Sequence, residues 1–448
     1  MTDGMSSAGA FELSQNFQRI NFLLQRLFLA LSRREVRNPG VEGPGQPFFL
    51  RAAVSHAQGW MTNPMKAMNS QIQFWQNTTA LYAELTQAML SGGGRLTPKA
   101  AGDDGPEDAR FANEEWDKHP FFYYLKRQYQ IMSEYLESIA DTASTGEDEK
   151  HNEQVHFFTH QLVDLFSPAN FLASNPVAIK KAVETNGRSL VEGLENLVKD
   201  LERSGGDLLV TLSDPEAFKV GETLATAKGH VVDETELFQL IRYEPTTEKV
   251  YARPLMLIPP WINKYYILDL QPKSSLVKWL TDQGFAVYIV SWKNPREELR
   301  EYGMDSYVTQ GVVPAMKKVD ALHGNDGVNV VGYCIGGTTL SLTQAWLQKT
   351  KQENPAKSCT FFTALTDFED PGPLKSFIDE GFITGIMVEA HRKGFLDQRI
   401  MARTFSFLRP NDLVYGPAVK AYLLGEARPK FDLLFWNEDS TRLPERMA

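Results

Sequence analysis

Residues 332–337 read Gly-Tyr-Cys-Ile-Gly-Gly, and this short stretch decides the fold class of the chain. It follows an apolar run, Val-Asn-Val-Val at 328–331, and precedes Thr-Thr-Leu-Ser-Leu at 338–342, which can open a helix. A nucleophile raised on a sharp turn sits in strained, crowded backbone, so its neighbours must be nearly free of side chain. The pattern is that of a nucleophile elbow with Cys334 in the serine position. The backbone N–H of Ile335 is then expected to be an oxyanion donor, and a cysteine indicates acyl transfer through a thioester.

Strands and helices alternate on both sides of this turn. Short apolar runs, typical of strands that are buried on both faces, alternate with segments of helical spacing. The expected strands are residues 255–258, 286–291, 328–332 and 359–365, and the expected helices are residues 274–283, 307–322 and 339–349. A nucleophile at a strand's carboxyl end in this pattern predicts an α/β fold with a parallel sheet. An antiparallel meander is expected before it, with strands at 218–224, 229–235 and 236–243.

The chain divides into four parts with different sequence patterns. Residues 1–10 are small and polar, which predicts a disordered N-terminus. Residues 11–206 carry mainly amphipathic helical spacing and are expected to form a helical N-terminal domain. Residues 207–366 form the predicted α/β core. In residues 367–448 the alternation stops, which predicts a cap region with an incomplete core.

Composition excludes several classes of function. The 448 residues are 42% hydrophobic and 23% charged, as in ordinary globular proteins, and the net charge of −10 argues against nucleic acid as a partner. Two cysteines, Cys334 and Cys359, are too few for a disulfide framework, so a reducing, cytoplasmic setting is expected. No apolar run is long enough to span a bilayer, and we find no phosphate loop, dinucleotide fingerprint or metal motif.

Several unrelated strings carry a family resemblance. Residues 259–270 read PPWINKYYILDL, residues 332–338 read GYCIGGT, residues 406–413 read SFLRPNDL, and residues 431–437 read FDLLFWN. Together and in this order they resemble the polyhydroxyalkanoate synthases. The long N-terminal region and the Gly-Tyr-Cys elbow look like class I, the poly-3-hydroxybutyrate type. The resemblance covers most of the chain from about residue 60 onward.

This resemblance implies a fold, a reaction and partners. The fold would be an α/β-hydrolase core with a cap insertion, preceded by a helical domain tied to homodimerisation and to the polyester granule surface. The reaction would polymerise short-chain (R)-3-hydroxyacyl-CoA with release of CoA, with Cys334 carrying the acyl group. The region of Asn263, after the strand at 255–258, would supply the second oxyanion donor; the bland reading is that Pro259 and Pro260 simply shape a turn there. No separate cofactor is expected, because the CoA thioester is itself the substrate.

The chain departs from the family in one respect. The family's cysteine works with an Asp and a His after the cap, near the last two core strands, and no segment here matches either motif. We therefore expect the last core strands to be missing and the chain alone to be inactive. A triad of Cys334 with Asp367 or Asp370 and His391 can be written, but residues 370–391 are too few for the intervening strand and helix. The competing interpretation is two loop carboxylates and a solvated histidine.

The second thiol and the first apolar stripe each allow two interpretations, and the reaction allows three. Cys359 begins a buried strand, which favours a core thiol over a second catalytic one. The apolar stripe at 22–31 suits a granule surface, although packing against another helix or a dimer partner is the commoner explanation. A thioesterase or hydrolase on the same fold would release monomers instead of polymer. A non-catalytic chain would bind granules or pair with an intact synthase.

Overall fold

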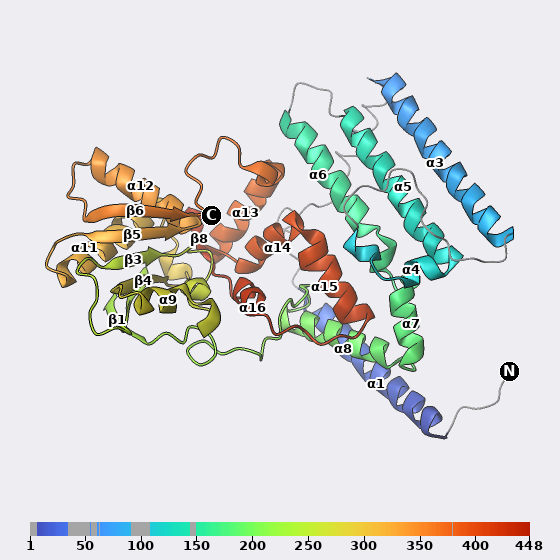
Figure 1. The fold of residues 1–448 in the computed structure, drawn as a ribbon, viewed down its shortest axis with the longest axis horizontal. Helices are drawn as coiled ribbons and strands as arrows, with labels where there is room; N and C mark the ends of the chain where they lie inside the picture. The colour runs from blue at the N-terminus through green and yellow to red at the C-terminus, as the bar shows by residue number, and fades with distance from the viewer. Residues whose placement is uncertain are drawn as a thin grey trace.

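The structure, a computed structural model, describes residues 7–34, 54, 61, 63–90, 108–143, 149–378 and 380–448. An α/β core lies at one end of the molecule and a layer of N-terminal helices at the other (Figure 1). Helices of the C-terminal part lie between the two (Figure 1).

The core is a six-stranded sheet in the order β1-β2-β4-β3-β5-β6. Its strands are β1 (Gly229–Glu234), β2 (Phe238–Tyr243), β3 (Leu255–Ile258), β4 (Val287–Trp292), β5 (Val328–Tyr333) and β6 (Ala356–Phe362). The last four run parallel, whereas β2 pairs antiparallel with β4, and β1 with β2. The predicted α/β fold with a mainly parallel sheet is therefore confirmed.

Alternating residues of the central strands feed two separate cores, which explains why these strands are apolar throughout. Met256 and Ile258 of β3 join the cluster formed with α11 (Val313–Leu322) and α12 (Ile335–Lys349). Leu255 and Leu257 point to the other face, where α9 (Leu276–Asp282) covers the sheet. The helices therefore cover the sheet on both faces, and the turns that follow the parallel strands lie at its carboxyl edge.

Two predicted elements differ from the structure: one predicted strand is a turn, and one predicted helix begins as a π-helix. Residues 218–224 form a turn instead of a strand, because Gly221 has φ of +86° and three N–H groups, from 222 to 224, bond to the Lys219 carbonyl. The helix predicted at 307–322 begins as a π-helix over Tyr307–Val312 before it becomes α11. The two other strands of the predicted meander are confirmed as β1 and β2.

The N-terminal part is helical, as expected from its periodicity. It comprises α1 (Ser7–Ser32), α3 (Pro64–Leu90), α4 (Glu115–Lys118), α5 (Pro120–Ala143), α6 (Glu149–Leu165), α7 (Pro176–Glu184) and α8 (Arg188–Arg203). Helices α3, α5 and α6 lie side by side, and α1 packs on α8 (Figure 1). Residues 7–10 of the segment predicted to be disordered belong to α1, and residues 1–6 lie outside the described residues.

The stripe predicted at 22–31 divides between two surfaces. Leu23 is buried against Val191 and Val198 of α8, with Leu27 packed beside it, so helix packing accounts for this half. Phe22 and Phe28 are 59% and 77% exposed, so the other half of the stripe faces outward.

The C-terminal part ties the core to the N-terminal helices. Its elements are α13 (Glu380–Lys393), β7 (Phe395–Leu396), α14 (Gln398–Leu408), π-helices at Asn411–Tyr415 and Val419–Leu423 around α15 (Gly416–Ala418), α16 (Asp432–Glu438) and β8 (Leu443–Pro444). The buried carboxylate of Asp200 on α8 accepts hydrogen bonds from Tyr422 Oη at 2.6 Å, from the Arg428 guanidinium and from Thr211. None of the described helices is long and apolar enough to cross a bilayer.

Candidate active site

Cys334 lies on the turn between β5 and α12, at the carboxyl edge of the sheet. Its backbone has φ of +54° and ψ of −129°, a region that residues with a side chain rarely adopt. Its N–H donates to the Phe362 carbonyl of β6 at 2.9 Å, and its own carbonyl accepts from Gly337 at 2.8 Å. The strained turn is therefore held from both sides, and the partly buried thiol is free.

The glycines around Cys334 are required by close backbone contacts. A Cβ on Gly332 would lie 2.5 Å from the Cα of Gly337, across the turn. A Cβ on Gly336 would overlap the Ile258 carbonyl oxygen and lie 2.7 Å from that of Pro259. Strand β3 and helix α12 thus meet backbone to backbone, which explains the Gly-x-Cys-x-Gly spacing in physical terms.

Ile335 begins α12, so its N–H has no acceptor one turn earlier in the helix. The amino end of this 15-residue helix also carries a partial positive charge. A developing oxyanion beside Cys334 would meet both features. The arrangement can stabilise a tetrahedral intermediate, and the role of Ile335 stays a prediction.

Asn263 follows β3, the neighbour of β5, so it lies at the same edge of the sheet as Cys334. Its Nδ2 donates to Ser440 Oγ at 3.4 Å, and the carbonyl of Ile262 accepts from the Thr441 N–H at 2.9 Å. Residues 439–442, which we call the C-terminal strap, therefore run along the loop after β3. No hydrogen bond among the described residues joins Asn263 to Cys334, so its oxyanion role also stays a prediction.

The acidic residues and the histidine that could form an internal triad are engaged elsewhere. Asp367 and Asp370 are exposed, and each accepts the N–H two residues later, from Glu369 and Gly372, at 3.0 Å. His391 lies on α13, and its Nδ1 is 2.7 Å from Glu445 Oε1. No hydrogen bond or ion pair among the described residues joins these groups to Cys334, which favours the interpretation as loop carboxylates and a surface histidine.

Cys359 lies in β6, partly buried, and burial raises the pKa of its thiol. A raised pKa reduces the thiolate fraction and therefore the reactivity at neutral pH. The predicted buried strand beginning at Cys359 is wrong, because β6 begins at Ala356 and is mostly exposed, but Cys359 itself packs against the core.

Sequence reasoning missed the residues that support the turn from behind. Trp261 is buried and its Nε1 donates to Thr339 Oγ1 on α12 at 3.1 Å, which ties the loop after β3 to the helix after Cys334. Trp292 Nε1 likewise donates to the Pro259 carbonyl at 2.9 Å. Two tryptophans at the ends of buried strands were a usable signal, since buried indole N–H groups usually find an acceptor.

The C-terminal strap was also missed. Thr441 Oγ1 donates to the Trp261 carbonyl at 2.5 Å, and the Arg442 N–H donates to Asn294 Oδ1 after β4 at 2.9 Å. The strap thus connects the loops after two neighbouring strands. Its partners lie far earlier in the chain, so this contact had no local signal in the sequence.

Comparison with known proteins agrees with the resemblance. Residues 107–280 match the family model of the poly-beta-hydroxybutyrate polymerase (PhaC) N-terminus. The poly(3-hydroxyalkanoate) polymerase of Methylorubrum extorquens is 39% identical over 396 residues, which is 88% of this chain and 64% of the relative. The polymerase subunit PhaC of Cupriavidus necator is 41% identical over 371 residues, 81% of this chain and 60% of the relative.

A third relative, the polymerase subunit PhaC of Rhizobium etli, is 35% identical over 385 residues, 86% of this chain and 60% of the relative. The chain thus spans about three fifths of the length of the curated relatives it matches. Over most of its own length, the chain is similar to the poly(3-hydroxyalkanoate) polymerases, and its residues 107–280 match the model of that family's N-terminal region.

Proposed function

We propose that this chain is an acyltransferase that polymerises short-chain (R)-3-hydroxyacyl-CoA into polyhydroxyalkanoate. The observation that carries the proposal is the strained strand–turn–helix geometry at Cys334, which presents a thiol beside the free N–H groups of α12. The printed names of the relatives support the reaction class.

In the proposed reaction, Cys334 Sγ attacks the thioester carbonyl of the substrate. The carbonyl oxygen becomes an oxyanion, which the N–H of Ile335 and the region of Asn263 stabilise. The intermediate then expels CoA thiolate, which takes up a proton, and leaves the acyl group as a thioester on Cys334. The hydroxyl of a second hydroxyacyl group attacks this thioester and forms the ester bond of the polymer. The C–S bond to Cys334 breaks, and the hydroxyl proton passes to the released Cys334 thiolate. No resident cofactor is needed, because CoA is part of the substrate.

The test is covalent labelling of Cys334 with 3-hydroxybutyryl-CoA, followed by mass spectrometry of the peptide that contains it. We expect Cys334→Ala to abolish the acyl adduct and the CoA release that accompanies its formation. Cys359→Ala is the matched control, since it removes the other thiol and should leave both readouts unchanged. An adduct on Cys359, or undiminished labelling of Cys334→Ala, would contradict the proposal.

We also propose that this polypeptide alone turns over very slowly. No imidazole or carboxylate of the described residues is hydrogen-bonded to the Cys334 thiol, and a nucleophile without its base loses most of its rate. Product analysis separates the possible activities. Free 3-hydroxyacid would indicate a thioesterase, polymer would indicate an active synthase, and no product with retained granule binding would indicate a non-catalytic partner of an intact synthase.

The exposed apolar surfaces support a proposal about partners and location. Phe28 and its exposed neighbours on α1 suit contact with an apolar polyester surface, so we place the protein on granules in the cytoplasm.

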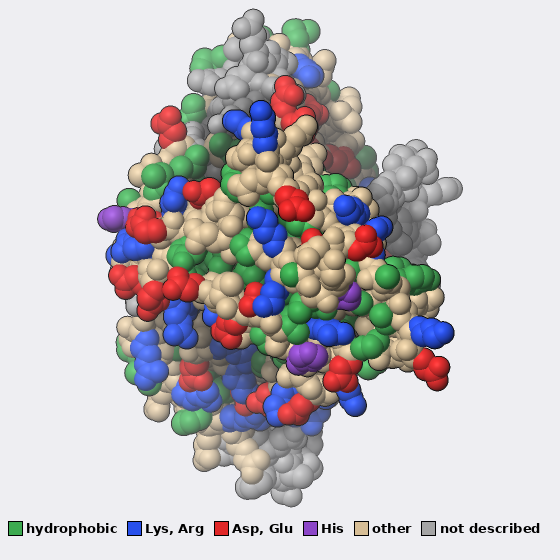
Figure 2. All heavy atoms as spheres, turned by 90° about the vertical axis from the view of Figure 1, so that its left-hand side faces the viewer, with side chains coloured by type: hydrophobic (Ala, Val, Ile, Leu, Met, Phe, Trp, Pro, Cys, Tyr) green, Lys and Arg blue, Asp and Glu red, His purple; other side chains and the backbone are tan. Residues whose placement is uncertain are grey.

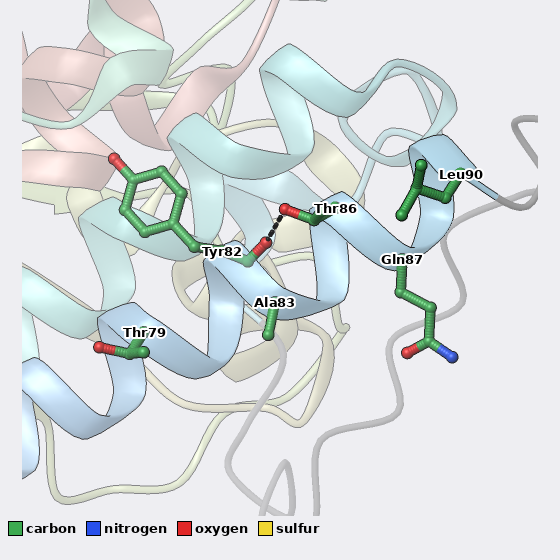
Figure 3. Close-up of a pocket in the computed structure, with 6 residues that line it drawn as sticks. All are labelled: Thr79, Tyr82, Ala83, Thr86, Gln87 and Leu90. Atoms are coloured by element: carbon green, nitrogen blue, oxygen red, sulfur yellow. Dashed lines mark hydrogen bonds between the residues drawn. The ribbon is translucent and has the colours of Figure 1, made fainter.

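A second exposed seam suits a homodimer. Along α3, the exposed apolar side chains recur mostly every three or four residues, at Met65, Met68, Ile72, Trp75 and Tyr82. The opposite seam of α3, with Leu81 and Leu85, already packs on α5. Figure 3 shows the carboxyl half of the exposed seam, where a shallow hollow is lined by Thr79, Tyr82, Ala83, Thr86, Gln87 and Leu90. A 3.5-residue period is typical of helices that pair with another helix.

A further inference from the structure

A polar cavity of about 480 Å³ lies beside the loop after β4. Its lining residues are Lys293, Asn294, Arg296, Glu298, Leu299 and Arg442. Most of them follow β4 directly, whereas Arg442 comes from the C-terminal strap. Because parallel strands end at the same edge of a sheet, the cavity and Cys334 share that edge.

The cavity is rich in cationic donors that lack acceptors. Neither guanidinium, of Arg296 or Arg442, makes a hydrogen bond or ion pair with another residue that the structure describes. The Nε of Arg442 is buried without an acceptor, and the guanidinium lies over the Phe395 ring, 4.5 Å from its centroid, which fixes its position. A buried N–H without a partner costs free energy, which contact with an anionic ligand would offset.

Two carboxylates oppose this charge. Glu298 lies in the lining, and Glu234 holds Lys293 at 2.7 Å. The two guanidinium groups therefore make the net charge of the cavity positive. Elsewhere on this end of the molecule, acidic and basic side chains are interspersed (Figure 2), and the whole chain carries a net charge of −10. Planar guanidinium groups match the geometry of phosphate oxygens, which they can bind in pairs.

The position of the cavity relates it to the acyl-transfer site. Strand β3 lies between β4 and β5, so the ends of β4 and β5 are two strand spacings apart, roughly 10 Å. Trp292 at the end of β4 bonds to Pro259, against which Gly336 packs. A ligand with phosphates in the cavity and a long flexible arm could therefore extend its far end to Cys334.

We propose that this cavity, between the loop after β4 and the C-terminal strap, binds the phosphate groups of a CoA thioester while its acyl end reaches Cys334. Arg296 and Arg442 are the binding residues. The assignment rests on the proposed acyl-transfer function, and it adds where the substrate's charged part is held.

Calorimetric titration of the full chain with CoA, dephospho-CoA and inorganic pyrophosphate tests this assignment without requiring turnover. We expect Arg296→Gln to weaken CoA binding about tenfold, the loss of one charge-assisted contact. Arg296 is exposed and unpaired among the described residues, so this substitution should not disturb folding. Arg33→Gln, directly after α1 and outside the cavity lining, removes the same charge and should leave CoA affinity unchanged. Raised salt should weaken wild-type binding more than binding by Arg296→Gln.

Each outcome bears on the assignment. Equal CoA affinity of Arg296→Gln and Arg33→Gln would overturn it. Pyrophosphate binding as tight as CoA binding would overturn the CoA assignment and leave a general phosphate site. CoA binding that depends on Arg296 without any acylation of Cys334 would retain the cavity and reject the proposed reaction. Labelling of Cys334 that does not depend on Arg296 would support the proposed reaction and reject the CoA site in this cavity.

Discussion

Gly336 is held in place by contact alone, which makes it a sharp probe of the turn at Cys334. Its φ is negative, but the space for a Cβ is filled by the carbonyl oxygens of Ile258 and Pro259. We expect Gly336→Ala to push the start of α12 away from β3 and to lower the free energy of unfolding by about 2–4 kcal/mol. Chemical denaturation measures this loss, and Cys334 labelling should fall with it.

Gly324→Ala separates this steric effect from ordinary backbone strain. Gly324 has φ of +77° with nothing within 4 Å of the added methyl group. Its substitution should cost only about 1 kcal/mol, from the unfavourable backbone conformation. If both variants lose the same stability, close contact with β3 is not what requires glycine at 336.

At this scale the sequence predicted the elbow well and its surroundings poorly. The spacing of glycines around Cys334 has a local cause, because the turn brings the flanking residues into contact within a few positions. The supporting bonds from Trp261 and Thr441 join segments far apart in the chain, so no local pattern could predict them.

Among the elements, helix α9 begins at a serine that is hydrogen-bonded to a buried aspartate with a raised pKa. Ser275 caps the helix by accepting from the Lys278 N–H at 2.9 Å, and its hydroxyl donates to buried Asp269 at 2.6 Å. Burial raises the pKa of Asp269 above its usual range, although Ser275 and the Ala227 N–H oppose the shift. The native state therefore holds this proton more tightly than the unfolded chain, and stability falls as pH rises through the raised pKa.

Asp269→Asn removes that titration. Relative to wild type, the variant should gain stability as pH rises from about 4, the ordinary pKa of an aspartate, through the raised pKa of Asp269, by about 1.4 kcal/mol for each unit of pKa shift. Urea unfolding at a series of pH values gives the difference. Asp282→Asn, at the other end of α9, is a control of opposite sign. Lys278 holds the pKa of the exposed Asp282 below its usual value, so this variant should lose relative stability as pH rises. Parallel slopes for the two variants would refute the argument.

Element types were predicted where a single cause dominated. Strands β3, β4 and β5 are buried on both faces, and their continuous apolar runs predicted this burial. Residues 218–224 also looked like a short strand, yet Gly221 in the left-handed region and the Lys219 carbonyl close them into a turn. A short apolar run does not distinguish a strand from a turn, because tertiary contacts decide which of the two forms.

At the scale of the whole molecule, the arrangement of the parts could not be read from the sequence. The pattern separated N-terminal helices, core and C-terminal region, but gave no sign that the C-terminal region is joined to α8 through Asp200, Tyr422 and Arg428. Such polar contacts depend on which surfaces meet after folding. Amphipathic spacing shows that a helix has an apolar face, but it does not show which surface packs against that face.

The exposed seam of α3 is such a face, and a second copy of the chain is the partner that we expect. The seam has no charged residue between Lys66 and Glu84, so two copies would meet without repulsion and salt should not separate them. Ile72→Gln with Trp75→Gln should shift the protein from dimer to monomer in sedimentation velocity, because both side chains are about half exposed in one chain. Val183→Gln on α7 removes a more exposed apolar side chain outside the seam and should leave the dimer intact. A monomeric wild type, or dissociation by Val183→Gln alone, would show that α3 does not pair with its copy.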